Sequence, residues 1–185
     1  MYSPQRLGYL AAGIIAALAL GACATVNVGS FSAKGVDFKQ YRTYDWAPTD
    51  QLETGDPRLD NNPFFLDQLQ GQVERRLAAK GYEKATSGTP ALILHYHASV
   101  TQRLDLGNVD PKYYDPNKKE CNGCGPFIYD EGSLVIDFVD AKTDKLVWRG
   151  WAEGSIDGVV DRQDRMDETI DQAVARIFAK LPRVL

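Results

Sequence analysis

The chain has 185 residues, with 25 acidic against 21 basic side chains and a net charge of -4 at pH 7. That length suits one domain with a buried core once a targeting segment is set aside. A mildly acidic chain with neither a basic stripe nor a polybasic cluster excludes electrostatic binding of nucleic acid and of anionic lipid headgroups.

The amino terminus carries a secretory pattern. Arg6 is the only charge before an uncharged run over residues 7–26, which is typical of a signal peptide. The segment Leu20-Gly21-Ala22-Cys23 resembles the bacterial lipobox, in which a peptidase cuts before a Cys that carries diacylglycerol. We therefore expect residues 1–22 to be removed. The alternative is an uncleaved anchor, since about 20 apolar residues can span a bilayer.

Lipidation of Cys23 predicts where the mature protein resides. Two or more acyl chains anchor a protein stably, so Cys23 would hold the chain to a membrane by its first residue. Ala24 follows, in place of the Asp that resembles an inner-membrane retention signal in Gram-negative lipoproteins. We expect the outer membrane, on its periplasmic face.

The next segments predict two strands and a helix. Residues 24–40 are weakly patterned and predict a tether that leads into an edge strand. Residues 41–48 are rich in aromatic side chains and stop at Pro48, which predicts a short aromatic strand. Asn62 and Pro63 then suit a helix cap and first turn, with Gly81 past the end. Between them the apolar residues recur at helical spacing: Phe65, Leu66, Leu69, Val73 and Leu77.

A strand over residues 91–101 carries both histidines of the chain. One of its faces is apolar, which leaves His95 and His97 together on the other. This alternation is typical of a half-buried antiparallel strand. Residues 105–131 are rich in Asp and Glu but lack the D-x-D-x-D-G spacing of a calcium loop, so a long loop with solvated acids is expected.

Cys121 and Cys124 form a C-x-x-C pair in that loop, and three interpretations of the pair stay open. In an oxidising compartment it forms a disulfide, whose effect on stability is modest because the closed loop is small. With His95 and His97 it would instead supply the Cys2His2 set that zinc prefers. Redox chemistry needs the pair at a helix amino terminus, whereas glycine and proline surround it here.

Residues 132–156 predict a β-hairpin that turns at residues 140–144. Trp148 and Arg149 point to opposite faces of the second strand, so Trp148 is expected in the core. Arg149 and Trp151 share the open face and are the candidates for contact with a partner. Asp137 lies on the same face of the neighbouring strand, and we expect an ion pair between Arg149 and Asp137.

A closing helix ends before Pro182, and its apolar residues share one side: Met166, Ile170, Val174, Ile177, Phe178 and Leu181. Two helices and several one-faced strands predict an α+β fold, a two-layer sandwich of an antiparallel sheet with two helices packed on one face. The expected organisation is a lipoprotein signal peptide over 1–22, a lipidated tether and first strand over 23–40, and a single α+β domain over 41–182.

Four segments stand out together: Tyr41-x-Thr43-Tyr44-x-Trp46, Lys80-Gly81-Tyr82, Gly132-Ser133-Leu134-x-Ile136-Asp137 and Leu146-Val147-Trp148-Arg149-Gly150-x-Ala152. They resemble the bacterial envelope lipoproteins catalogued as domain of unknown function 4136. The resemblance spans roughly residues 25–182 and implies a small lipoprotein with one α+β domain. It brings no activity, cofactor or catalytic residue, and the C-x-x-C loop and the histidine pair lie outside its pattern.

The expected function is therefore not catalytic. The sequence has no nucleophile elbow and its two histidines share one strand, which argues against a hydrolase or thiol enzyme. We expect a structural or interaction module of the cell envelope, without a cofactor, that contacts the membrane through its lipid and an envelope protein or polymer as partner. The alternative is a metal- or small-ligand-binding module that uses His95, His97, Cys121 and Cys124.

Overall fold

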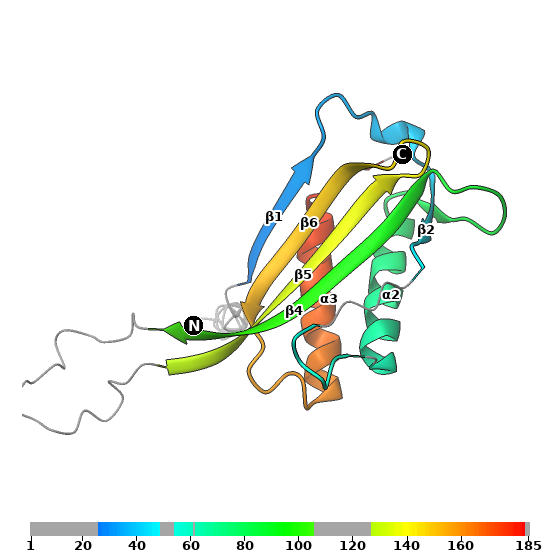
Figure 1. The fold of residues 1–185 in the computed structure, drawn as a ribbon. Coiled ribbons are helices and arrows are strands. Elements are labelled where there is room, and N and C mark those ends of the chain that lie inside the picture. The colour runs from blue at the N-terminus through cyan, green and yellow to red at the C-terminus, as the bar shows by residue number, and fades with distance from the viewer. Residues whose placement is uncertain (1–25, 49–53, 61, 106–126, 184–185) are drawn as a thin grey trace, which may run out of the picture.

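The computed structural model describes residues 26–48, 54–60, 62–105 and 127–183. Within these residues six strands form one sheet in the order β1-β6-β5-β4-β2-β3, accompanied by two α-helices and a short 3-10 helix (Figure 1). In chain order the elements are β1 (Asn27–Ser32), η3 (Phe38–Gln40), β2 (Thr43–Trp46), α2 (Pro63–Ala78), β3 (Glu83–Lys84), β4 (Leu92–Asp105), β5 (Phe127–Asp140), β6 (Lys145–Ser155) and α3 (Gln163–Ala179).

The sheet is mixed, so the prediction of a purely antiparallel sheet is wrong. Strands β1, β6, β5 and β4 pair antiparallel, but β2 pairs parallel with both β3 and β4. The cause is the position of α2 in the chain, between β2 and β4. A crossover helix returns the chain to the end at which the first strand began, so the two neighbouring strands run in the same direction.

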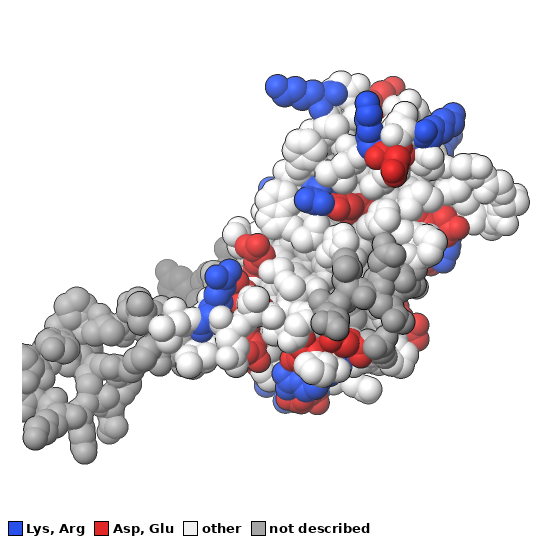
Figure 2. All heavy atoms as spheres, viewed as in Figure 1, with Lys and Arg blue, Asp and Glu red and all other residues white. Residues whose placement is uncertain are grey.

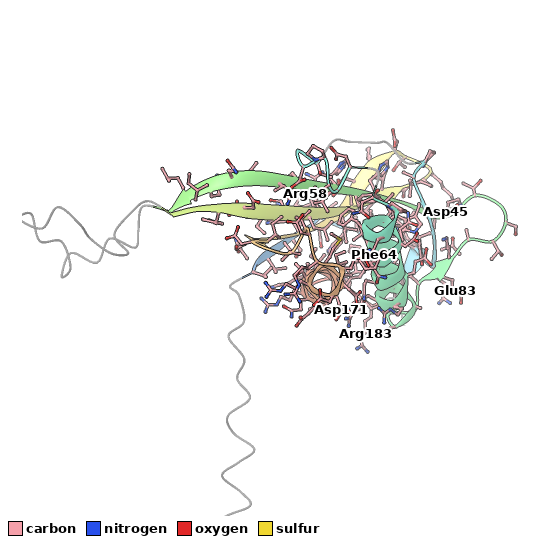
Figure 3. All side chains as sticks on the ribbon, turned by 90° about the horizontal axis from the view of Figure 1, so that it is seen from below. Asp45, Arg58, Phe64, Glu83, Asp171 and Arg183 are labelled. Atoms are coloured by element: carbon pink, nitrogen blue, oxygen red, sulfur yellow. The ribbon has the colours of Figure 1, made fainter. Side chains whose placement is uncertain are left out.

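Both helices lie on one side of the sheet (Figures 1 and 3), and their apolar faces share a core with the sheet. The centre of this core is aromatic. The ring centroids of Phe138 and Trp148 are 5.0 Å apart. The ring centroid of Phe178 on α3 lies 6.2 Å from that of Phe138 and 6.0 Å from that of Trp148. Trp148 is fully buried, as its alternation with Arg149 predicted.

The expected boundaries of α2 are confirmed, because its capping groups are in place. The side-chain oxygen of Asn62 accepts a hydrogen bond from the backbone N–H of Phe65 at 3.2 Å, and Pro63 is the first helical residue. This cap satisfies one of the donors that a helix start leaves without an intrahelical partner. Gly81, with φ at +90°, lies past the carboxyl end, in the conformation that glycine adopts most readily.

Strands β4 and β5 are longer than predicted, and the loop expected over residues 105–131 is correspondingly shorter at its carboxyl side. β5 already begins at Phe127, and its pairing with β4 continues to the register Asp105 opposite Phe127. The extension was not predicted because many of its residues on both strands are polar. Some of these residues pair between the two strands, since Arg103 Nε lies 2.7 Å from a Glu131 carboxylate oxygen. Cys23, Cys121 and Cys124 lie outside the described residues. No helix within the described ranges is long and apolar enough to cross a membrane.

Candidate functional site on the outer face of the sheet

The outer face of the sheet, which points away from α2 and α3, brings together residues that the sequence places far apart. Strand register aligns one row across four strands: Phe31, Arg149, Asp137 and His95. A second row lies beside the first, displaced from it by two residues on every strand. It consists of Gly29, Trp151, Val135 and His97. Because side chains two residues apart in a strand share a face, both rows belong to one surface.

Arg149 and Asp137 form the predicted ion pair at the centre of this face. The guanidinium donates through Nε and Nη2 to the two carboxylate oxygens of Asp137, each at 2.6 Å. The Asp137 side chain is only 7% exposed, whereas that of Arg149 is 45% exposed. The hydrogen bond to Asp137 raises the pKa of Arg149 above its ordinary value. Both carboxylate oxygens are thus engaged in a bidentate pair, which orients the guanidinium edge.

Two aromatic side chains flank the ion pair. A Cβ atom at Gly29 would collide with the indole of Trp151, so the ring lies close over this glycine, and only a residue without a side chain leaves it that room. Phe31 is 50% exposed beside Arg149. Figure 2, drawn from the same side as Figure 1, shows this face as largely uncharged, with basic and acidic side chains mainly toward its ends.

The structure places His95 and His97 on the same outer face, both half-buried, with Asp137 and Val135 as their neighbours on β5. Two imidazoles are half of a tetrahedral zinc set. Within the described ranges no group of three or more His, Cys, Asp or Glu side chains could hold a metal ion. Since Cys121 and Cys124 lie outside those ranges, the zinc site and the disulfide both stay predictions.

Phe31 and Gly29 are the members of this face that sequence reasoning missed. Residues 24–40 show little periodicity, and the alignment of β1 with β6 follows from pairing along the edge of the sheet rather than from a local pattern. Arg149 and Trp151, by contrast, were predicted to share a face from alternation alone. The resulting surface offers an oriented guanidinium, two imidazoles and two aromatic rings. Such a set suits recognition by stacking and hydrogen bonding.

The chain is similar to a catalogued family and to several solved structures. The family model described as a domain of unknown function, DUF4136, matches residues 28–183. No curated protein matches. A PDZ domain protein from Parabacteroides distasonis is similar in fold, with a TM-score of 0.55 at 16% identity; the match covers 85% of this chain and 36% of that one.

Two structures of PelC dodecamers from Paraburkholderia phytofirmans also match. One has a TM-score of 0.48 at 11% identity and covers 86% of this chain and 99% of that one. The other has a TM-score of 0.46 at 12% identity and covers 87% and 100%. At these identities the similarity concerns the fold alone.

Proposed function

The chain belongs to the DUF4136 family, a domain of unknown function, over residues 28–183, and on that premise we propose that it is a periplasmic lipoprotein of the outer membrane. In this proposal Cys23 carries the lipid, and the folded domain acts by binding an envelope protein or polymer rather than by catalysis. The sheet and the two helices would form two layers, and the helix layer would leave the outer face of the sheet available to a partner.

The observation that carries the binding role is the composition of the outer face. Phe31 leaves half of its surface in water, which favours contact with a partner over solvent. Next to it the Arg149 guanidinium is held in place by a nearly buried carboxylate, so less side-chain freedom is lost when a partner binds. Aromatic residues and arginine are the residue types that dominate binding energy at protein interfaces.

Replacement of Cys23 by serine tests the anchor. The sulfur is the atom that would carry diacylglycerol, so the Cys23→Ser variant is expected to lose its fatty acids and to move from the membrane fraction to the soluble periplasmic fraction. Mass spectrometry of the amino terminus and fractionation of cells measure both effects. A Cys121→Ser, Cys124→Ser variant is the matched control and is expected to stay with the membrane. An intact Met1 in the wild-type protein would contradict the proposal.

A photo-crosslinking amino acid in place of Trp151 tests the binding face. We expect a specific adduct in whole cells from this position, and none from the same amino acid at Glu168, which is exposed on α3. Adding Phe31→Ser should weaken the adduct, because loss of an aromatic anchor costs about 2 kcal/mol, or roughly 30-fold in affinity. Equal adducts from positions 151 and 168, or no effect of Phe31→Ser, would contradict a binding role for this face.

A further inference from the structure

The end of the sheet at which β1 begins carries apolar surface that the outer face does not account for. Among the described residues three large apolar side chains are exposed: Phe31, Leu104 and Ile128. Phe31 belongs to the outer face. Leu104 and Ile128 are 54% and 61% exposed and lie directly opposite each other on β4 and β5. They form one small apolar patch, the Leu104–Ile128 pair.

This pair stands on a ribbon of only two strands. Pairing of β6 with β5 ends at Ser155 opposite Glu131, and the Ile156 N–H still donates to the Asp130 carbonyl oxygen at 2.9 Å; beyond Asp130, among the described residues, only β4 accompanies β5. Figure 3 shows the two strands projecting past the rest of the sheet. A two-stranded ribbon is at best marginally stable in water without an apolar surface to pack against. The ribbon therefore needs a covering partner for its exposed apolar pair.

The length of the tether indicates what that partner is. The register Asn27, Glu153, Ser133, Ser99 places the start of β1 level with Ser99. From Ser99 the ribbon extends five residues to Leu104, about 17 Å along the strand. The four residue steps from Asn27 back to Cys23 span at most about 14 Å. A lipid on Cys23 thus keeps the start of β1 within about 14 Å of the bilayer surface. This distance is shorter than the ribbon, so the ribbon can reach the bilayer.

A second apolar feature opens at the same end of the domain. A groove of about 140 Å³ lies between the inner side of the sheet and α3, and the first described residue, Val26, lines it. Val100, Ile156, Val159 and Val160 are among its other lining residues. At the root of the ribbon Arg103 is paired with Glu131, and the Asp157 carboxylate accepts a hydrogen bond from the backbone N–H of Asp130. The Leu104–Ile128 pair lies beyond these charged groups, an order that matches the headgroups and acyl chains of a bilayer surface.

From these observations we infer that the Leu104–Ile128 pair inserts into the surface of the phospholipid bilayer, as a second membrane contact beside the lipid on Cys23. The inference rests on the proposed function, because the short tether matters only if Cys23 is lipidated. It adds a fixed orientation: the ribbon end faces the bilayer, and the hairpin turn between β5 and β6 points into the periplasm. Sequence reasoning expected the lipid as the only membrane contact.

The test places a photo-crosslinking amino acid at Ile128 in the full chain. The purified lipidated protein is reconstituted into vesicles of phosphatidylethanolamine and phosphatidylglycerol and irradiated. The matched control carries the same amino acid at Thr143, which is exposed in the turn at the opposite end of β5. We expect a mass gain of one phospholipid at position 128 and none at position 143.

Each other outcome overturns the inference in a recognisable way. An adduct of two protein chains at position 128 would show that a second copy covers the pair. An absent or equal lipid adduct at positions 128 and 143, in a sample whose mass shows acylated Cys23, would refute the insertion and leave the anchor intact. A mass without fatty acids on Cys23 would refute the anchor and the insertion together.

Discussion

Truncation of Trp148 to alanine is expected to lower the free energy of unfolding by about 3–5 kcal/mol, the cost of removing a large aromatic side chain from a close-packed core. Trp148 is fully buried and contacts the rings of Phe138 and Phe178. A Cβ atom at Gly150 would overlap the indole ring, so the backbone of β6 is packed directly against it. Urea denaturation of the wild-type and variant proteins, followed by circular dichroism, measures the difference.

The Trp148→Phe variant is the matched control for that experiment. Within the described ranges the indole Nε1 of Trp148 is buried and has no hydrogen-bond partner. Phenylalanine keeps a ring at this position and removes the unpaired donor, whose burial is unfavourable. Trp148→Phe should therefore lower the free energy of unfolding much less than Trp148→Ala does. Equal losses for the alanine and phenylalanine variants, or a loss below about 1 kcal/mol for alanine, would contradict a central role for Trp148.

The elements of this fold could be predicted where a local pattern determines them. The Asn62 cap, the helical spacing through Leu77 and the alternation of the hairpin around Trp148 all reflect short-range geometry. The direction of β2 could not be predicted in the same way. It depends on which strand β2 lies beside, and the two-residue β3 that completes that edge has no sequence signature.

The candidate site was predictable in pieces but not as a unit. Alternation within one strand puts His95 beside His97, and Arg149 beside Trp151. Both pairs lie on one surface only because of the register of β4 against β5. A shift of one residue in that register would place the two pairs on opposite faces of the sheet. Asp137 links the two pieces, because it pairs with Arg149 on one side and lies opposite His95 on the other. Such alignment is a property of the whole sheet.

Stability should fall steeply between pH 10 and pH 12, because three buried tyrosines resist ionisation in the folded state. Burial raises the pKa of Tyr41, Tyr44 and Tyr82 to about 12. The carboxylate of Asp140, which accepts a 2.7 Å hydrogen bond from the Tyr41 hydroxyl, adds to the effect. The negative charge of Glu74 does the same for Tyr44.

The sign of the effect follows from proton binding in the two states. Below pH 10 all three phenols are protonated in both the folded and the unfolded chain, so their contribution to the free energy of unfolding is fully present. Between pH 10 and pH 12 the unfolded chain releases protons that the folded chain retains. Each tyrosine then lowers the free energy of unfolding by about 1.4 kcal/mol per pH unit. Urea denaturation at half-unit pH intervals measures the slope.

The Tyr82→Phe variant isolates one of the three contributions. Its hydroxyl makes only a long hydrogen bond, 3.4 Å to the carbonyl oxygen of Pro182, while its ring packs edge-on against Phe138 at a centroid distance of 6.0 Å. Phenylalanine keeps that ring contact, so stability at neutral pH should change little. The slope above pH 10 should fall by up to about one third, because one of the three phenols whose pKa is raised to about 12 no longer titrates. An unchanged slope would show that burial of these side chains does not govern alkaline unfolding. So would an ultraviolet difference between the folded wild-type and Tyr82→Phe proteins in which the Tyr82 phenol titrates near pH 10.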